Sequence, residues 1–274
     1  MKIDMHCHTK EGSTDGSIPI RDYIARLSEL GFGGMVVTDH DSYDGYRAYQ
    51  RDVMGKEFPN FRVFKGIEYD TINAGHILVI MPENIKLRIL EMRGMGIDRL
   101  IQIVHKYGGI LGPAHPCGEK YLSYANSLKG RRVSTMLKFD FIEAFNSCET
   151  AQSNKEAACL ARVYHKPGTG GSDSHKIDCV GRAWTEVPDS IKRESDLIEY
   201  IRSGGELSYG GVPYRHTTKD KLGPLNRVLV NGYYFYNKVW GLIRFRKRVR
   251  ELKKKDLTLP TKEALQKKDQ LRSA

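Results

Sequence analysis

The chain has 274 residues, of which 40% are hydrophobic and 28% are charged, and its net charge is +11. This length is enough for one large barrel domain, and the hydrophobic fraction is enough to fill its core. Five cysteines, odd in number and without a C-x-x-C pair, argue against a disulfide framework and fit a reducing compartment. A strand is expected at the very start, which leaves no room for a signal peptide, so we expect a cytoplasmic protein.

The basic excess lies at the C-terminus. Residues 212–274 hold 17 Lys or Arg against 5 Asp or Glu, a net charge of +12, so residues 1–211 are close to neutral. We therefore expect two parts: a barrel domain over 1–211 and a basic, partly helical extension over 212–274.

The first predicted element is a strand over residues 2–9, in which apolar and polar residues alternate. Alternation places His6 and His8 on one face and Cys7 on the other. Two imidazoles at this spacing can hold one metal ion, although hydrogen-bonded surface or core histidines are the alternative.

Strands and helices then alternate along the chain. Residues 10–17 form a polar loop whose Asp15-Gly16 is either an ordinary turn or a carboxylate that folds back onto a metal site. Further extended segments are expected at 34–39, 62–69, 76–81, 110–114, 139–145, 168–173, 180–187 and 206–210. Helices are expected at 19–31, 44–57, 84–107, 150–165 and 194–203. This alternation indicates βα units and a parallel sheet.

Potential metal ligands recur at the ends of these strands, one strand after another. In chain order they are His40, Glu68, His76, His115, Asp173 and His175. The carboxyl ends of barrel strands are where active sites lie. By contrast, His105 and His165 fall in predicted helices, and we interpret them as structural.

Seven short motifs occur in a fixed order. They are His6-x-His8, Asp15-Gly16, Thr38-Asp39-His40-Asp41, Gly66-x-Glu68, Gly75-His76, Ala114-His115-Pro116 and Gly171-Ser172-Asp173-Ser174-His175. Together, over roughly residues 1–210, this set resembles the PHP family (polymerase and histidinol phosphatase domain). The resemblance implies an α/β fold, a distorted (β/α)7 TIM-like barrel, with a trinuclear metal centre.

By the same resemblance, nine residues would hold three divalent transition-metal ions. The first ion would take His6, His8, Glu68 and Asp173; the second Glu68 as a bridge with His76 and His115; and the third Asp15, His40 and His175. Mixed imidazole and carboxylate ligands suit Zn²⁺, Mn²⁺ or Fe²⁺.

The activity implied is that of a metal-dependent phosphoric ester hydrolase. A hydroxide bridging two ions would attack phosphorus in line, with Glu68 and Asp173 as the catalytic ligands and without a protein nucleophile. Arg182 could clamp phosphate in a bidentate way, or could be a salt-bridged surface arginine; Asn146 is a second candidate substrate contact. We expect phosphomonoesters of nucleotides or short oligonucleotides as substrates, and no obligate protein partner is evident.

Three alternatives stay open. Histidinol-phosphatase-like activity is less favoured, because those members usually carry a histidine where Asp15 stands. An amidohydrolase-type metallohydrolase commonly adds a bridging carboxylated lysine, where this chain offers Glu68. A non-catalytic metal-binding PHP module would tend to have lost some of its ligands.

The extension contains an apolar run, residues 228–243, with one charge. Six residues recur there at helical spacing: Leu225, Leu229, Tyr233, Tyr236, Trp240 and Ile243. Residues 244–255 then hold eight Lys or Arg and one Glu. The run is shorter than the roughly 20 apolar residues of a membrane-spanning helix. We expect its apolar face to pack on the barrel exterior; weak contact of the basic tail with an anionic membrane surface or with nucleic acid is the alternative.

Overall fold

The computed structural model describes residues 1–118, 122–127 and 132–215, and eight separate residues further on: Val228, Gly232, Phe235, Tyr236, Val239, Ile243, Arg246 and Arg250. The strands within these ranges are β1 (Lys2–Cys7), β2 (Gly34–Val37), β3 (Arg62–Asp70), β4 (His76–Ile80), β5 (Ile110–Pro113), β6 (Ile142–Asn146), β7 (Gly168–Gly171), β8 (Ala183–Glu186) and β9 (Ser208–Gly211). The helices are α1 (Ile20–Glu29), α2 (Asp44–Asp52), α3 (Ile97–Lys106), α4 (Val133–Met136), α5 (Ala151–Val163) and α6 (Glu194–Arg202). Three 3₁₀ turns are η1 (Arg88–Glu91), η2 (Tyr124–Asn126) and η3 (Ile177–Cys179).

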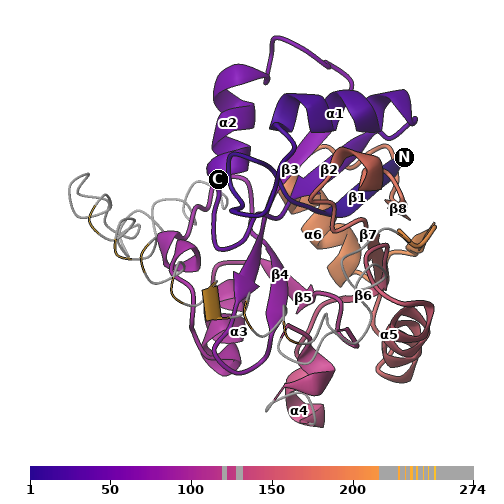
Figure 1. Ribbon diagram of the computed structural model, residues 1–274. Coiled ribbons are helices and arrows are strands. Elements are labelled where there is room, and N and C mark those ends of the chain that lie inside the picture. Colours follow the sequence, from indigo (N-terminus) through magenta and orange to yellow (C-terminus); the bar gives the residue numbers. More distant parts are fainter. Residues whose placement is uncertain are drawn as a thin grey trace, which may run out of the picture.

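The strands curl into a barrel (Figure 1). Seven of them form one sheet in the order β5-β4-β3-β2-β1-β8-β9, and β6 pairs with β7 separately. The β6–β7 pair lies between β5 and β1 and closes the barrel there. The Asp140 N–H donates to the Leu111 carbonyl at 2.9 Å on one side, and the Asp173 N–H donates to the His6 carbonyl at 2.8 Å on the other. The expected fold class, a distorted TIM-like barrel, is confirmed.

The expectation of a parallel sheet is wrong for four of the seven strand pairs. The pairs β1–β2, β2–β3 and β6–β7 are parallel, whereas β3–β4, β4–β5, β1–β8 and β8–β9 are antiparallel. Between β3 and β4 the chain makes a tight turn instead of a helical crossover, with the Thr71 hydroxyl donating to the Gly75 carbonyl at 2.6 Å. Gly75 has φ +68°, a conformation that favours glycine, and its ideal Cβ would lie 2.4 Å from the Leu122 carbonyl oxygen.

The prediction of one helical region over 84–107 is also wrong. The structure has the short turn η1 and then α3, which begins at Ile97. Gly94 between them has φ +93°, outside the helical region, and the Met95 N–H donates to the Tyr69 hydroxyl at 2.9 Å. Tertiary bonds therefore replace the helical ones at this point.

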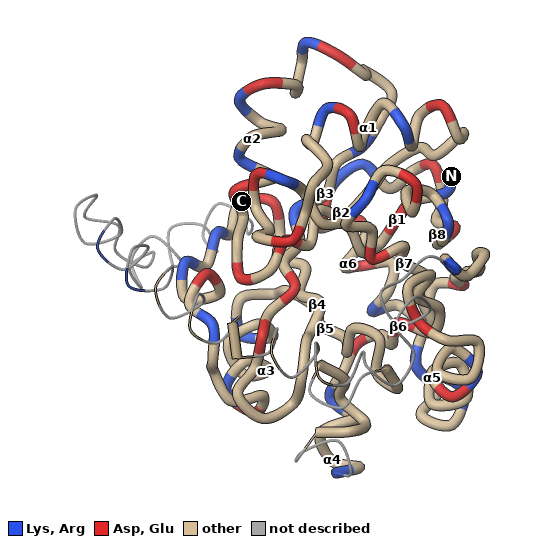
Figure 2. The backbone as a smooth tube through the Cα atoms, viewed as in Figure 1, with Lys and Arg blue, Asp and Glu red and all other residues tan. Residues whose placement is uncertain are grey.

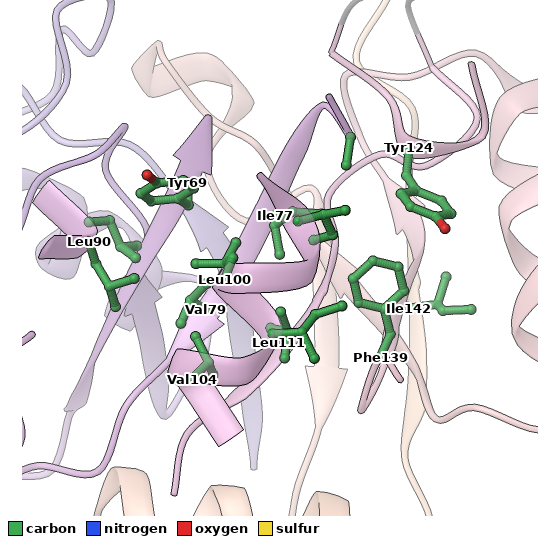
Figure 3. Packing of buried hydrophobic residues seen from close by; sticks show 14 of the residues in the cluster. Tyr69, Ile77, Val79, Leu90, Leu100, Val104, Leu111, Tyr124, Phe139 and Ile142 are labelled. Atoms are coloured by element: carbon green, nitrogen blue, oxygen red, sulfur yellow. The ribbon is translucent and has the colours of Figure 1, made fainter. Parts of the chain in front are cut away.

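Both faces of the central strands are buried. On the outer face of β4, Ile77 and Val79 pack against α3, where Leu100 and Val104 lie one helical turn apart (Figure 3). On its inner face, Leu78 and Ile80 join a second cluster that fills the barrel and includes residues of α6. Because β4 is covered on both sides, its sequence over Ile77–Ile80 is continuously apolar and does not alternate with polar residues.

The outer surface of the barrel carries charges of both signs. Lys and Arg are interspersed with Asp and Glu along α1, α2 and α5 (Figure 2). This agrees with the near-neutral charge of residues 1–211. Within the part of the chain that the structure describes, no helix has the length and apolar character needed to cross a membrane.

Two residues of the predicted apolar face belong to the described part of the extension. Tyr236 is 54% exposed and Ile243 is 50% exposed, and the packing of this face on the barrel stays a prediction. Leu225, Leu229, Tyr233 and Trp240 lie outside the described residues. The division into a domain over 1–211 and an extension over 212–274 stays a prediction.

One lysine is fully buried and fixes a loop to the barrel. Lys65 on β3 is 0% exposed, and its Nζ donates to the carbonyl oxygens of Pro82, Glu83 and Ile85 at 2.8, 3.0 and 2.9 Å. The ammonium group thereby ties three carbonyls of one loop to β3, and the Pro82 carbonyl also accepts the Ile85 N–H at 2.9 Å.

We expect Lys65→Met to lower the free energy of unfolding by about 2–4 kcal/mol, because three part-buried carbonyls would lose a charged donor. Chemical denaturation measures the change. The matched control is Lys86→Met in the same loop, where the exposed Lys86 bonds only to the Gln50 side chain. Equal stabilities of the two variants would contradict this account.

Candidate metal centre

The nine candidate ligands lie at one end of the barrel. His6 is on β1 and His8 just follows it, His40 follows β2, His115 follows β5, and Asp173 and His175 follow β7. Glu68 lies near the end of β3, and an isolated bridge joins His40 to it. His76 begins β4 instead of ending it. Because β4 is antiparallel to β3, with Asp70 opposite His76, the start of β4 lies at the same edge as the end of β3.

Four donor atoms form a compact cage. His6 Nε2 lies 3.1 Å from His8 Nε2, 3.4 Å from Glu68 Oε2 and 3.5 Å from Asp173 Oδ1. His8 Nε2 lies 3.3 Å from the same Glu68 oxygen and 3.2 Å from the same Asp173 oxygen. Ligands about 2.1 Å from a tetrahedral ion are about 3.4 Å apart. The five distances are therefore in the range expected between ligands of one divalent ion.

The other ring nitrogens fix which atoms face this cage. His6 Nδ1 lies 2.9 Å from Glu143 Oε1, and His8 Nδ1 lies 3.0 Å from Ser13 Oγ, which itself donates to Asp39. These acceptors require a proton on each Nδ1, so both Nε2 atoms present lone pairs. Two lone pairs 3.1 Å apart repel each other unless a cation or a proton lies between them.

Glu68 faces a second set of donors with its other oxygen. Its Oε1 lies 3.0 Å from His76 Nδ1 and 3.1 Å from His115 Nε2. Its Oε2 is buried without a hydrogen bond of acceptable geometry, although His40 Nδ1 is 3.0 Å away. One carboxylate thus faces two groups of imidazoles, as a bridging ligand must.

Asp15 brings together the third set. Its Oδ2 lies 3.5 Å from His40 Nε2 and 3.5 Å from His175 Nε2. His175 Nδ1 is 2.9 Å from the Asp173 carbonyl oxygen, which leaves Nε2 as its lone-pair atom. His8, His40 and His175 also place donor atoms within 4.8 Å of one another. Asp15-Gly16 is therefore a folded-back carboxylate beside two imidazoles.

Two family models match the chain. The PHP domain model matches residues 4–159, more than half of the chain, and a PHP-associated model matches residues 151–205. The chain belongs to the PHP family.

One curated relative and two solved structures show how far the similarity extends. The DNA polymerase/3'-5' exonuclease PolX of Bacillus subtilis (strain 168) is 31% identical over 246 residues, which cover 71% of this chain and 40% of PolX. PsfC from Pseudomonas syringae PB-5123 has a TM-score of 0.58 at 17% identity, over 87% of this chain and 98% of that one. Endonuclease Q, solved with a 27-mer duplex bearing an abasic lesion at the active site, has a TM-score of 0.55 at 18% identity, over 81% of this chain and 60% of that one. These two structures share the fold.

The candidate ligands shift one another's pKa values. Burial opposes charge on His6, but nearby carboxylates, first Asp173 and then Glu143, outweigh it and raise the pKa of His6 well above its ordinary value. Burial also opposes charge on Glu68, yet the surrounding imidazoles, led by His76, hold the pKa of Glu68 well below its ordinary value. Burial, together with His175 and His40, lowers the pKa of His8. Carboxylates are thus ionised beside a mixture of charged and neutral imidazoles.

The backbone near the centre is held in unusual conformations. His115 has φ +28° and Asp173 has φ +53°, which cost roughly 1–3 kcal/mol each for residues other than glycine. Close packing supports them. A Cβ on Gly171 would lie 2.3 Å from the Cβ of His6 and 2.6 Å from Glu143 Oε1, so β7 can approach β1 only with glycine at this position.

Glu143 is a residue that the sequence did not single out. Its side chain is fully buried on β6, and its Oε2 accepts the His115 N–H at 2.5 Å and the Asn146 amide at 3.1 Å. The available signal was a glutamate in the apolar strand 139–145, where a lone charge requires a partner. Ser13 and Asp39 were also missed. Ser13 bonds to His8 Nδ1 and donates to Asp39, and these contacts arise only in the folded barrel.

The two residues predicted to contact substrate, Asn146 and Arg182, are bonded to other parts of the protein. Asn146 is 1% exposed, and its amide also donates to Asp173 Oδ2 at 3.2 Å. Arg182 donates from Nε to the Asp178 carbonyl at 3.0 Å, and its guanidinium lies 5.4 Å from the centre of the Tyr214 ring. Their contact with substrate stays a prediction. His105, which was interpreted as structural, has its Nε2 2.9 Å from Asp140 Oδ2, and Asp140 is not one of the nine candidate ligands.

We expect Glu143→Gln to weaken metal affinity by about 10- to 100-fold, because the amide no longer enforces the Nδ1–H tautomer of His6. Competition with a chromogenic chelator measures the affinity, and circular dichroism checks the fold. Glu156→Gln is the matched control, since Glu156 is exposed on α5 and bonds only to Gln152. Unchanged affinity in Glu143→Gln would refute the orienting role.

We also expect metal uptake to release protons and to weaken as the pH falls. Burial lowers the pKa of His175, but Asp15 outweighs it and raises that pKa to about 9. Since metal binds the deprotonated ring, affinity should rise from below pH 6.5 to above pH 9. Calorimetry in buffers of different ionisation enthalpy counts the protons. Uptake without proton release at pH 7 would show that the imidazoles are already neutral.

Proposed function

We propose that this protein is a metal-dependent phosphoesterase that hydrolyses phosphomonoesters of nucleotides or short oligonucleotides. The observation that carries the proposal is the close approach of donor atoms of His6, His8, Glu68 and Asp173, with the second oxygen of Glu68 facing a further set of imidazoles. Membership of the PHP family supports it.

The residues would divide the work as follows. His6, His8, Glu68 and Asp173 would hold one Zn²⁺, Mn²⁺ or Fe²⁺; Glu68, His76 and His115 a second; and Asp15, His40 and His175 a third. Bound divalent ions supply Lewis-acid chemistry: they ionise water near neutral pH and neutralise charge on phosphoryl oxygens.

The chain itself supplies positioning. Glu68 fixes the spacing of two donor sets because its two oxygens belong to one rigid carboxylate. Glu143 and Ser13 hold His6 and His8 in the tautomer that faces the cage. Such prior orientation of charged groups is the main source of rate enhancement in phosphoryl transfer.

We propose that Arg182 contacts the phosphate. Its Nε–H is used by Asp178, and the Tyr214 ring lies against the guanidinium, so its orientation is restricted while further N–H donors remain on the same plane. A substrate contact by Asn146 would require its amide to exchange the bond to Asp173 for one to substrate.

Nucleotides and oligonucleotides are favoured as substrates by two named relatives. PolX is called a DNA polymerase and exonuclease, and endonuclease Q was solved with duplex bearing a lesion at the active site. This chain spans 40% of PolX, so the reactions of that whole protein are not assigned to it. Cleavage of internal phosphodiesters is the second candidate.

The C-terminal extension is proposed as a weak contact for anionic surfaces, either membrane or nucleic acid. Phe235 is 72% exposed and Val239 54% exposed, and Arg246 and Arg250 are also exposed. Exposed apolar and basic side chains together favour surface contact over packing on the barrel. A cytoplasmic location stays a prediction.

The test of the proposed function is a screen of protein reconstituted separately with Zn²⁺, Mn²⁺ and Fe²⁺. The substrates are nucleotides, sugar phosphates, histidinol phosphate, 5'-phosphorylated oligonucleotides and an unphosphorylated duplex, with an amide and a lactone panel beside them. We expect turnover of phosphomonoesters. Turnover of amides or lactones alone would favour the amidohydrolase alternative, and none at all in metal-loaded protein would favour the non-catalytic one.

We expect Glu68→Gln and Asp173→Asn to lower kcat/KM at least 10³-fold in that assay, because each removes a charge from the cage. The fold should persist, as judged by circular dichroism, and Glu156→Gln should retain full activity. Full activity of Glu68→Gln with normal metal content would disprove the bridging role of this carboxylate.

A further inference from the structure

Two cysteines lie beside the Asp173 turn, outside the nine candidate ligands. Cys148 follows β6 and Cys179 ends η3, and their Sγ atoms are 3.5 Å apart although 31 residues separate them in the sequence. Cys148 is half-buried, whereas Cys179 is 1% exposed. Two thiols in van der Waals contact, one of them accessible, have the arrangement of an attacking and a resolving cysteine.

Both sulfurs rest on the backbone that carries Asp173. Cys148 Sγ lies 3.5 Å from the Ser172 carbonyl oxygen and 3.4 Å from the Asp173 carbonyl oxygen. Cys179 Sγ lies 3.7 Å from the Ser172 carbonyl oxygen. The next contact leads into the centre, since the Asp173 N–H donates to the His6 carbonyl at 2.8 Å. A change at the two sulfurs therefore acts on the segment that presents Asp173 and His175.

We propose that Cys148 and Cys179 form a peroxide-sensitive disulfide site whose oxidation displaces the Asp173–His175 segment and weakens metal binding. The formation of the disulfide stands on the geometry of the two thiols alone. Its consequence rests on the proposed function, because that assigns Asp173 and His175 to metal.

The reaction uses one hydrogen peroxide. One of the two sulfurs attacks a peroxide oxygen, the O–O bond breaks, and a sulfenic acid and one water are formed. The other sulfur then attacks the sulfur of the sulfenic acid, the S–O bond breaks, and a second water is released. The two thiols lose two electrons and two protons in total, and the peroxide is reduced to two waters.

Closure requires movement in this part of the barrel. A disulfide bond is about 2.05 Å long, so the sulfurs must approach by about 1.5 Å from their 3.5 Å separation. Oxidation also removes the S–H donors that face the Ser172 and Asp173 carbonyls. Asp173 already has φ +53°, a conformation that persists only while its surroundings hold it. The turn is therefore the part most sensitive to the new bond.

The experiment uses the full chain loaded with Zn²⁺, which has no redox chemistry of its own. The protein is titrated with hydrogen peroxide, mapped by mass spectrometry without reduction, and tested for Zn²⁺ affinity by chelator competition. We expect a Cys148–Cys179 cross-link and an affinity at least 10-fold weaker, both reversed by dithiothreitol.

Variants separate this site from general oxidation. Cys148→Ser and Cys179→Ser should keep, after peroxide, the Zn²⁺ affinity that each has before it. Cys159→Ser, at an exposed cysteine of α5, should respond as the wild type does. Should Cys148→Ser fail to fold, Cys179→Ala tests the same point.

Two results would overturn the proposal: thiols 148 and 179 that stay reduced while Cys159 is oxidised, or a cross-link that leaves Zn²⁺ affinity unchanged. Phosphoesterase activity is not used as a readout. A cross-link with weakened Zn²⁺ binding in a protein without phosphoesterase activity would count against the proposed function and not against this site.

Discussion

The Glu68 carboxylate is the group on which the end of the barrel depends. Its two oxygens lie 3.0–3.4 Å from nitrogens of five imidazoles, those of His6, His8, His40, His76 and His115. A buried carboxylate without cationic partners would be strongly unfavourable, and a buried group of neutral imidazoles would leave lone pairs opposed. The buried carboxylate therefore requires the imidazoles, and the imidazoles require the carboxylate. The backbone N–H of Glu68 bonds to the Thr38 carbonyl at 3.1 Å, so the regular pairing of β3 beside β2 places the carboxylate.

The mixed sheet is what makes the arrangement possible. A strictly alternating βα barrel would deliver donors only from the carboxyl ends of its strands. Here β4 returns directly after β3, and His76 reaches the same edge from the start of a strand. The separate β6–β7 pair then closes the barrel, bringing Glu143 under His6 and Asp173 beside His8. The two departures from a regular βα barrel, the antiparallel β4 and the separate β6–β7 pair, therefore bring side chains to the candidate metal centre.

The positions of most candidate ligands could be predicted from the sequence, because alternation within a strand and residue types at strand ends are both local signals. Period-two alternation placed His6 and His8 on one face, and the recurrence of His, Asp and Glu at strand ends indicated a shared site. Glu143 and Asp39 could not be found in this way, since each acts through a partner that is distant in sequence: His6 is 137 positions from Glu143, and Ser13 is 26 positions from Asp39. Ser13 is only five positions from His8, but a serine in a polar loop gives no signal of that contact. The division of the 84–107 region by Gly94 and the direction of β4 depend on tertiary contacts that helical periodicity does not encode. The proximity of Cys148 and Cys179 is likewise a property of the closed barrel.

The same charges explain how a fold with so many buried ionisable groups can exist before metal is bound. Asp15 and Asp173 have pKa values held well below the ordinary range: burial opposes this, but the nearby imidazoles, His175 for Asp15 and His6 for Asp173, outweigh it. Burial also opposes charge on His40, and the carboxylates, first Glu68, outweigh it and raise the pKa of His40. Protons on these rings neutralise the carboxylates in the metal-free protein. The apolar clusters that hold the strands lie along their faces, and the donors lie at their ends. In the proposed function, metal ions would compete with protons for the same lone pairs, and the barrel beneath would not have to unfold for the exchange.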